Sequence, residues 1–151
     1  MKNFTKNRKG FTLVELVVVI AILGILAGLA IPRFMDATAT ARGARLVADM
    51  RTIESAVTMQ YAEKGILANE VKELVNNGSY LAVIPTPPIG DYSVPESGQI
   101  GKVGSGAEYK LSESKTEAGS TTITRLPMVT VTNAGDGGNE IKSLEALLTK
   151  K

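Results

Sequence analysis

The sequence predicts an α+β protein in which one long N-terminal helix carries a small domain that contains β-strands. A basic leader is followed by an uncharged run at residues 16–31, and an amphipathic pattern continues from there to residue 64. Strand-like segments rich in β-branched residues gather in the last third of the chain. Because 151 residues suffice for one domain with a modest core, we expect a single head domain behind this helix.

Residues 1–10 are expected to form a short basic leader. They hold four of the 17 Lys and Arg residues and none of the 15 acidic residues. The intact chain has a net charge of +2, whereas a chain cut after Gly10 would keep 13 basic and 15 acidic residues and a net charge of −2. By the positive-inside rule, such a leader stays on the cytoplasmic side of a membrane.

A membrane helix is predicted over residues 11–32. The 21 residues at positions 11–31 contain one charged side chain, that of Glu15. At about 1.5 Å per residue, a helix of this length spans roughly the 30 Å hydrocarbon core of a bilayer. The segment therefore predicts a single-span protein whose remaining chain lies across the membrane from the leader.

An ordinary secretory signal is the competing interpretation of this run. Such signals have an apolar region of about 7–15 residues and a cleavage site of the A-x-A type, which the string ATATA at residues 37–41 could imitate. The uncharged run is already longer, and Pro32 and two charged residues precede that site. We therefore expect the helix to be retained. A mature N-terminus at Phe11 would agree with retention, and one at Thr40 or Arg42 would contradict it.

Residues 33–65 are predicted to continue as an amphipathic stalk helix that packs on the head. Arg45 and Asp49 can pair at helical spacing, and Gly65 marks the expected end of the helix. Apolar side chains recur at spacings of three, four or seven residues, which places them on one face. This stripe consists of Met35, Ala39, Leu46, Met50, Ile53, Val57 and Tyr61.

The head domain is predicted over residues 66–151. A short helix is expected at residues 68–76 with Asn69 as its cap, followed by a rigid proline link at residues 85–88. Residues 90–106 are rich in glycine, proline and serine and are expected to form a loop. Strands are predicted at residues 108–112, 121–126 and 128–132, a turn at residues 133–139, and a final helix within residues 140–149.

Two missing residue types exclude several classes of function. The chain has no cysteine and no histidine, so it has no disulfide framework, no thiolate metal site and no Cys or His nucleophile. Enzymatic activity is therefore not expected. The near-neutral chain behind the leader does not favour nucleic-acid binding through bulk charge, and the four arginines within residues 33–51 leave a DNA track only as an alternative.

Glu15 is the outstanding polar residue of the apolar run. A carboxylate costs about 2.5–3.5 kcal/mol at the centre of a bilayer and less near the interface, so it invites a cationic partner. The alternative is that Glu15 lies at the headgroup level and needs no partner. A cut after Gly10 favours the first interpretation, because the new α-amine of Phe11 on a neighbouring copy could neutralise Glu15 as it leaves the lipid.

Gly24 and Gly28 form a G-x-x-x-G pair inside the apolar run. Small residues at this spacing allow the close approach of two helices in a membrane. Pro32 cannot donate a hydrogen bond to the carbonyl of Gly28, and its ring crowds that carbonyl. Residues 24–32 are therefore where this helix is expected to bend or unwind.

The string KGFTLVEL at residues 9–16, followed by the apolar helix and Pro32, resembles the processing and assembly motif of type IV pilins and type II secretion pseudopilins. The resemblance covers about the first third of the chain. It implies a prepilin peptidase that cuts between Gly10 and Phe11 and methylates the new amine of Phe11. It also implies that Glu15 attracts the N-terminus of a neighbouring subunit, and that residues 24–32 lose helical order in a filament.

The pilin fold implied by this resemblance is a long N-terminal helix whose second half packs on a small antiparallel β-sheet. The implied protein is single-pass in the membrane with a cytoplasmic N-terminus before assembly, and part of an extracellular pilus afterwards. Its expected partners are further copies of itself, the prepilin peptidase, the inner-membrane pilus assembly machinery and membrane lipid. Adhesion, motility or DNA uptake would be properties of the filament.

Two alternatives stay open. A pseudopilin of a type II secretion system shares the motif, and a signal-anchored binding domain that never polymerises differs only through Gly10, Phe11 and Glu15. Many Gram-negative pilins close a C-terminal loop with a disulfide, which this chain cannot form. A receptor-binding loop of that kind is therefore not predicted.

No cofactor is expected, with calcium as one hypothesis. Asp136, Asn139 and Glu140 lie in or beside a glycine-rich turn and offer oxygen ligands, and major pseudopilins carry a calcium site in a comparable loop. Their spacing does not fit an EF-hand loop. The alternative is a plain turn in which Asn139 or Asp136 caps the last helix.

Overall fold

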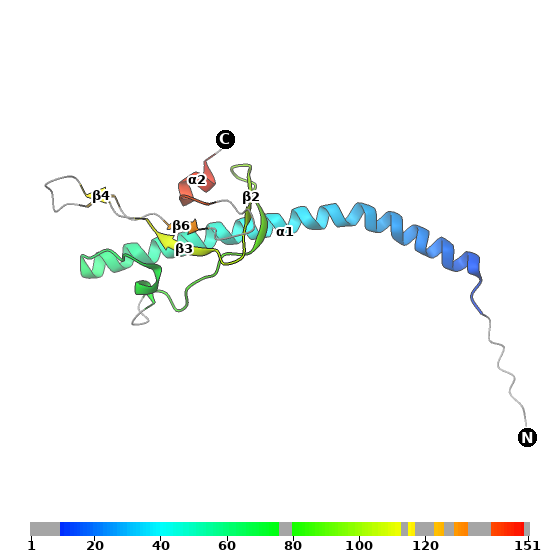
Figure 1. Cartoon of the computed structure of the whole chain (residues 1–151), viewed down its shortest axis with the longest axis horizontal. Helices are drawn as coiled ribbons and strands as arrows, with labels where there is room; N and C mark the ends of the chain where they lie inside the picture. Colours follow the sequence, from blue (N-terminus) through cyan, green and yellow to red (C-terminus); the bar gives the residue numbers. More distant parts are fainter. Residues whose placement is uncertain are drawn as a thin grey trace, which may run out of the picture. The chain divides into compact units, whose positions relative to one another are not determined.

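The structure, a computed structural model, describes residues 10–75, 80–112, 115–116, 123–125, 129–132 and 140–149. The chain divides into two compact units, Met1–Asp36 and Ala37–Lys151, and each is described by itself. The elements in chain order are α1 (Leu13–Lys64), η1 (Val71–Leu74), β1 (Gly90–Val94), β2 (Gln99–Val103), β3 (Glu108–Leu111), β4 (Lys115–Thr116), β5 (Ile123–Arg125), β6 (Val129–Thr132) and α2 (Leu144–Leu148) (Figure 1).

Helix α1 confirms the helix predicted from the membrane run to the end of the stalk. It stays helical across Pro32, so the single chain shows no unwinding at residues 24–32, and the loss of helical order in a filament stays a prediction. The helix ends at Gly65 as expected. Gly65 has a φ of 68°, and its N–H donates to the carbonyl oxygen of Tyr61 at 2.8 Å. Glycine adopts this left-handed conformation at little cost.

The stalk half of α1 forms one wall of the core of the second unit. Its buried stretch confirms the middle of the predicted apolar stripe and corrects both ends, because Met35 and Tyr61 are exposed. The fully buried positions of α1 lie between Gly43 and Gln60. The buried residues of α1 are Gly43, Leu46, Val47, Met50, Ile53, Ala56, Val57 and Gln60.

The stretch predicted as a loop at residues 90–106 contains the hairpin β1–β2 instead. The strands pair in antiparallel register, with Gly90 opposite Val103 at the open end. Tyr92, Val94 and Val103 are buried and join the core. The prediction was wrong because glycines interrupt the apolar alternation that identifies a strand, so the composition favours a loop. In the structure, alternate residues of β1 nevertheless pack into the core.

Strand β1 crosses α1 at Gly43 with no room for a side chain. A Cβ atom on Gly43 would overlap the carbonyl oxygen of Ser93. Because a backbone atom cannot turn aside as a side chain can, this position in the helix requires glycine. The neighbouring Arg42 donates from Nη1 to the carbonyl oxygen of Asp91 at 3.2 Å. The crossing thus fixes the hairpin to the stalk.

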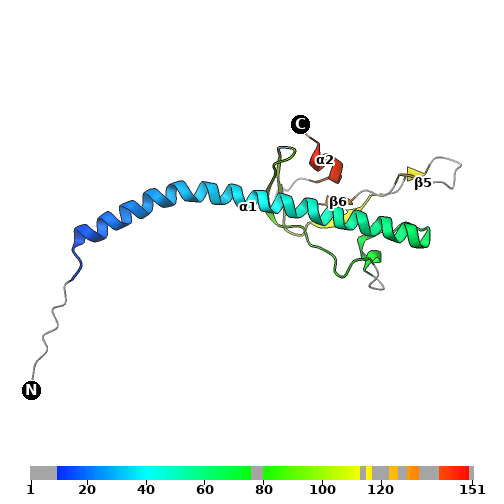
Figure 2. The same ribbon diagram turned by 180° about the vertical axis from the view of Figure 1, so that it is seen from behind.

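The predicted strands in the last third are confirmed as β3, β5 and β6, while the two-residue strand β4 has no counterpart in the prediction. β3 pairs with β6 and β4 with β5, both antiparallel. The α+β class is confirmed, with three two-stranded antiparallel sheets among the described residues in place of one small sheet. In both views β3 and β6 lie along the stalk half of α1 (Figure 2).

The helix predicted over residues 68–76 is a single 3₁₀ turn, η1. The predicted cap is wrong, because the capping position belongs to Glu70, whose side chain makes no capping hydrogen bond. Instead, the N–H of Asn69 donates to the carboxylate of Glu73 at 3.1 Å. Buried Val71 anchors the turn in the core.

The final helix predicted within residues 140–149 shrinks to α2. Ile141 exchanges two backbone hydrogen bonds with Val131 of β6, at 2.8 and 3.1 Å, and so leaves the helix to extend the β3–β6 pair. Ser97, in the turn between β1 and β2, donates to the carbonyl oxygen of Leu147 at 2.7 Å. The predicted turn at residues 133–139 lies outside the described residues.

Two tyrosines tie the head to the stalk. The Tyr80 hydroxyl donates to Glu63 at 2.6 Å, and the Tyr109 hydroxyl donates to Oδ2 of Asp49 at 3.0 Å. Asp49 also confirms its predicted pairing with Arg45, at 3.7 Å. Burial and the Asp49 carboxylate raise the pKa of the Tyr109 hydroxyl well above its usual value, because both disfavour the phenolate.

Candidate assembly site at the start of the long helix

The first turn of α1 is closed by a reciprocal pair of side chains. Oγ1 of Thr12 accepts a hydrogen bond from the N–H of Glu15 at 3.2 Å. In return, Oε2 of Glu15 accepts hydrogen bonds from the N–H of Thr12 at 2.9 Å and from its hydroxyl at 3.0 Å. This is a capping box, which satisfies two of the backbone donors that the start of a helix leaves open.

The cap leaves half of the Glu15 carboxylate available. Both hydrogen bonds go to Oε2, and Oε1 has no hydrogen-bond partner in the described part of the chain. The side chain is exposed. Its negative charge also lies at the positive end of the helix, which favours it there. A cation that reaches this end of α1 therefore meets an ordered carboxylate with one free oxygen.

Gly10 and Phe11 come directly before the cap, and both are exposed. The Phe11 side chain is 94% exposed. A Cβ atom on Gly10 would meet no atom within 4 Å, so the fold of the single chain does not require glycine there. The peptide bond between the two residues is open to a partner, and a need for glycine would have to come from that partner.

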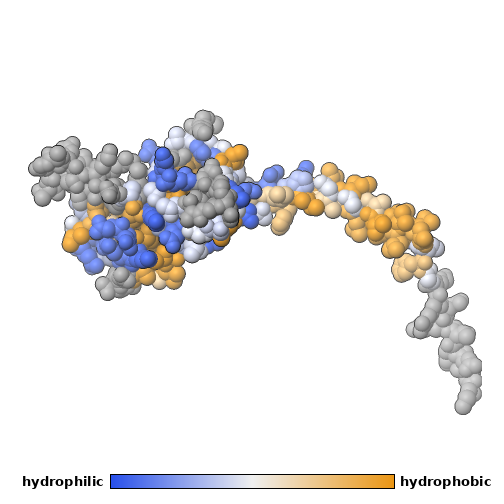
Figure 3. Space-filling view, in the orientation of Figure 1, coloured by the Kyte–Doolittle hydropathy of each residue, from blue (hydrophilic) through white to orange (hydrophobic). Residues whose placement is uncertain are grey.

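The apolar half of α1 is uncovered on every side. Its large apolar side chains between Leu13 and Ile31 are each 48 to 77% exposed. Figure 3 shows their apolar surface along this part of the chain. Among the described residues, α1 is the one helix long and apolar enough to cross a membrane. An apolar surface of this extent needs lipid or protein around it.

Gly24 and Gly28 lie inside this uncovered stretch. A Cβ atom on either residue would meet nothing within 4 Å, so no contact in the described part of the chain explains the two glycines. They leave a shallow surface on which a second helix can approach closely. Pro32 follows within the same helix. The roles of all three residues in assembly stay predictions.

The calcium hypothesis remains untested by the structure. Asp136 and Asn139 lie outside the described residues, and Glu140 is exposed. The described residues hold no group of three or more His, Cys, Asp or Glu side chains that could bind a metal ion.

Thr12 is the one residue of this site that is missing from the predicted set. The pattern T-x-x-E before an apolar run is a recognisable signal for a capping box, so the sequence did contain it. The same string also forms the predicted processing motif, and the roles inferred from that motif were assigned to Gly10, Phe11 and Glu15 rather than to Thr12. The structure adds that Thr12 orients the carboxylate on which assembly is predicted to depend.

Comparison with known proteins concerns the same end of the chain. Residues 5–31 match a family model described as "Prokaryotic N-terminal methylation motif". The match includes the predicted cleavage site, Glu15 and both glycines of the G-x-x-x-G pair, and it ends one residue before Pro32.

The similar curated proteins are pilus proteins. A fimbrial protein of Pseudomonas aeruginosa is 43% identical over 74 residues, which cover 49% of this chain and 44% of the relative. A type IV major pilin protein PilE of Neisseria gonorrhoeae is 48% identical over 59 residues, covering 39% and 35%. The chain thus spans less than half the length of these relatives. No solved structure matches it significantly.

Proposed function

We propose that this chain, whose N-terminal region is that of the type IV pilin superfamily, is the precursor of a structural subunit of a type IV pilus. The observation that carries the proposal is an exposed apolar half-helix that lies within the match to the methylation motif. Such a surface must be covered by lipid or by other proteins. A pilus subunit uses both covers in turn, first the membrane and then neighbouring copies of itself.

Before assembly, the subunit is stored as a single-span membrane protein. The basic leader stays on the cytoplasmic side, as the positive-inside rule requires, and the head lies on the other side. The reciprocal Thr12–Glu15 cap supports this stage, because it satisfies N–H groups that the start of the helix leaves open where the chain enters the bilayer. The cap thus lowers the cost of holding Glu15 at the membrane surface.

Processing then changes the charge next to the cap. A prepilin peptidase cuts between Gly10 and Phe11 and methylates the new amine. The exposed, unpacked backbone before α1 supports access by such an enzyme. Removal of the leader takes away four basic residues and creates one cation at Phe11, four residues before Glu15.

Assembly pairs that cation with the carboxylate of a neighbour. Oε1 of Glu15 accepts a hydrogen bond from the protonated Phe11 amine of another copy, while Oε2 remains in the cap. A pair of this kind inside an apolar fibre is costly to break, because removal of one partner leaves the other charge buried alone. The remaining apolar side chains of α1 then pack between copies, and the heads form the outer surface.

The experiment compares two variants with a matched control. Gly10→Leu should keep its leader and form no fibres, and Glu15→Ala should lose its leader yet form no fibres. Glu145→Ala, which removes an exposed carboxylate from α2, should behave as the wild type. Mass spectrometry of the N-terminus reports processing, and electron microscopy of cells reports fibres. Wild-type subunits should begin with N-methylated Phe11.

Two outcomes would overturn the proposal. Normal fibres from both Gly10→Leu and Glu15→Ala would show that neither processing nor the carboxylate matters for polymerisation. A wild-type chain that is processed or retained in the membrane but never found in fibres would instead favour a signal-anchored binding domain. Adhesion, motility and DNA uptake would be properties of the fibre surface, and they are tested only after fibres are seen.

A further inference from the structure

Arg33 is a charged residue inside an exposed apolar surface. Ile31 before it and Phe34 after it are 59% and 71% exposed. The Arg33 side chain is exposed too, and among the described residues it has no hydrogen bond or ion pair. Lipid headgroups can solvate an arginine at the end of a membrane helix. Once other copies cover this surface in a fibre, Arg33 needs an acidic partner, because a buried charge without one is costly.

Glu15 and Arg33 project from the same face of α1. They are 18 residues apart, which is about five full turns of an α-helix. Because α1 is helical over this whole stretch, the two residues lie about 27 Å apart along its axis. The positions between them on this face are large, apolar and more than half exposed. They are Val19, Ile22, Leu26 and Leu29.

An apolar strip with opposite charges at its two ends complements a shifted copy of itself. In two parallel helices that are shifted by 18 residues, Glu15 of one copy lies beside Arg33 of the other. The first copy offers its own Arg33 to a third copy in the same way. A contact of this kind joins two different parts of the subunit surface and does not close on itself, so it can continue into a filament.

We propose that Arg33 of one copy pairs with Glu15 of a second copy in the fibre, with an axial shift of about 27 Å between them. Arg33 donates to Oε1 of Glu15, the oxygen that the cap leaves open. A carboxylate oxygen has two lone pairs, so Oε1 can also accept from the Phe11 amine that the proposed function assigns to it. Asp36, three residues after Arg33, supplies the second negative charge of this cluster.

The stalk half of α1 has a groove for the side chains that this shift brings to it. The shift places Ile22 of one copy beside Thr40 of the other, which is 18 residues further along the sequence. Leu26 lies beside Ala44 in the same way. Thr40 and Ala44 line a groove of about 360 Å³ between α1 and the turn after β1. The docking segment is the exposed apolar half of α1, so the contact needs room for one bare helix.

The pair requires an intact helix between its two charges. In the single chain, α1 is helical from Leu13 to Lys64, which includes residues 24–32. Unwinding of that stretch, which the resemblance to pilins implies for a filament, would lengthen the spacing between Glu15 and Arg33 and move them off a common face. The proposal therefore predicts a continuous helix in this fibre. It rests on the proposed function, because the copies meet in this shift only in the fibre.

Disulfide cross-linking in purified fibres tests the shift, because the chain has no cysteine of its own. The double variant Ile22→Cys/Thr40→Cys should oxidise into a ladder of covalent multimers, since the two thiols of neighbouring copies face each other. The control Ile22→Cys/Thr52→Cys has the same number of thiols but places one of them about 18 Å further along α1. Equal ladders from the two variants, or no ladder from Ile22→Cys/Thr40→Cys, would overturn the proposed shift.

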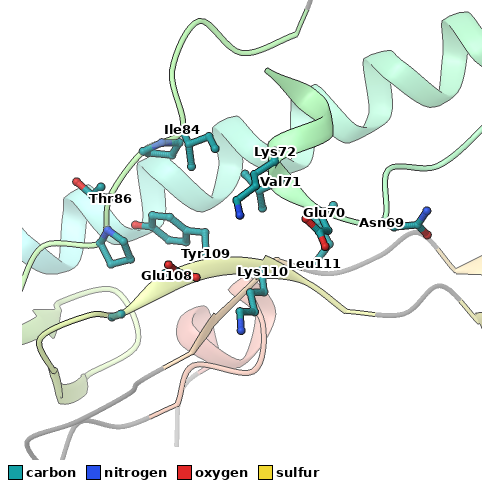
Figure 4. A pocket seen from close by; sticks show the side chains of 13 residues that line it. Asn69, Glu70, Val71, Lys72, Ile84, Thr86, Glu108, Tyr109, Lys110 and Leu111 are labelled. Carbon is teal, nitrogen blue, oxygen red and sulfur yellow. The ribbon is translucent and has the colours of Figure 1, made fainter. Parts of the chain in front are cut away.

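Charge reversal tests the pair in fibres without cysteines. Arg33→Glu places two carboxylates side by side and should lower the fibre yield at least about tenfold, whereas Arg33→Lys keeps the charge and should form fibres. The control is Lys72→Glu, which makes the same change of charge at a separate groove between η1 and β3 (Figure 4) and should behave as the wild type. Mass spectrometry should show complete leader removal in all three variants.

The outcomes separate this pair from the proposed function. Fibres of Arg33→Glu at the wild-type yield, or an equal loss of fibres in Arg33→Lys, would overturn the charge pair and leave the proposed function standing. A wild-type chain that forms no fibres would overturn the proposed function and the pair with it. If the cysteine variants form no fibres, the charge reversal alone decides.

Discussion

Helix α1 holds two leucines of identical chemistry in opposite environments. Leu23, in the apolar half, is 57% exposed, whereas Leu46, in the stalk half, is completely buried. The difference lies in the pattern around them. The first half is apolar on all faces, while the second carries one apolar stripe among charged residues.

The two patterns call for different covers. A one-sided stripe is covered by the head of its own chain, so its side chains stabilise the folded subunit. The all-round apolar surface is exposed among the described residues, so its side chains are expected to contribute when lipid or neighbouring copies surround them. In one continuous helix, the stalk half therefore stabilises the folded subunit, whereas the apolar half is available for the assembly contacts that we propose.

The largest expected effect is the contrast between the two leucines. Leu46→Ala should lower the free energy of unfolding of the head by about 3 kcal/mol, because it removes buried methyl groups and leaves a cavity. Leu23→Ala should change it by less than about 0.5 kcal/mol, as exposed sites do. Denaturant unfolding of full-length protein in micelles measures both. Equal losses would show that the halves do not differ in this way.

Two glycines of α1 sharpen the comparison. Gly43→Ala should cost about 2 kcal/mol, because the added Cβ overlaps the backbone of β1 and a packed core resists extra atoms. Gly28→Ala meets no atom in the single chain, so the head should unfold as in the wild type. If helices of neighbouring copies approach closely at Gly28, Gly28→Ala should lower the fibre yield although it leaves the stability of the head unchanged. A Gly43→Ala head as stable as the wild type would contradict the close approach of β1 to α1 at Gly43.

Tyr109 tests whether the stalk half is held by polar contacts as well. Tyr109→Phe should cost about 1.5 kcal/mol at neutral pH, since it removes a hydrogen bond to the Asp49 carboxylate. The pKa of Tyr109 is raised in the folded state, so its stabilising effect is complete below about pH 10 and is lost as the pH rises further. Denaturant unfolding from pH 7 to 11 should show a steeper alkaline fall in wild type than in Tyr109→Phe. Parallel curves would contradict this.

The smallest effect is expected at the cap. Thr12→Val should destabilise the first turn of α1 by about 1 kcal/mol, the usual value of a lost N-cap, without changing the unfolding of the head. Thr12→Ser keeps the hydroxyl and should restore the cap. Amide hydrogen exchange at Glu15 in micelles measures the change. Exchange in Thr12→Val as slow as in wild type would mean that the capping box does not form there.

The features that were predictable from sequence are those with a local cause. Gly65 ends α1 because of its own backbone, and Glu15 is conspicuous because it is the single charge in an apolar run. The hairpin β1–β2 has no such local signal, since its glycines interrupt the alternation. Gly43 looks like any helical glycine until β1 crosses it, because the contact joins residues 50 positions apart in the chain. Tertiary contacts of this kind do not appear in the periodic pattern of the sequence.

The candidate site divides in the same way. Gly10, Phe11 and Glu15 belong to a motif that is recognisable in the sequence, and among the described residues the hydrogen bonds of the Glu15 side chain stay within the first turn. The pairing of β3 with β6 could not be predicted, because it depends on which edges of the strands meet and on Ile141 pairing with Val131. A strand pattern reports which face is buried and is silent about which edge is free.

The central claim is that the apolar half of α1 is covered by neighbouring copies in a fibre. The most direct test is the thiol reactivity of Leu23→Cys in purified fibres freed from membrane, compared with Glu145→Cys on the exposed surface of α2. A water-soluble maleimide should label position 145 readily and position 23 only after the fibres are dissociated. Equal labelling of the two positions in intact fibres would contradict the account.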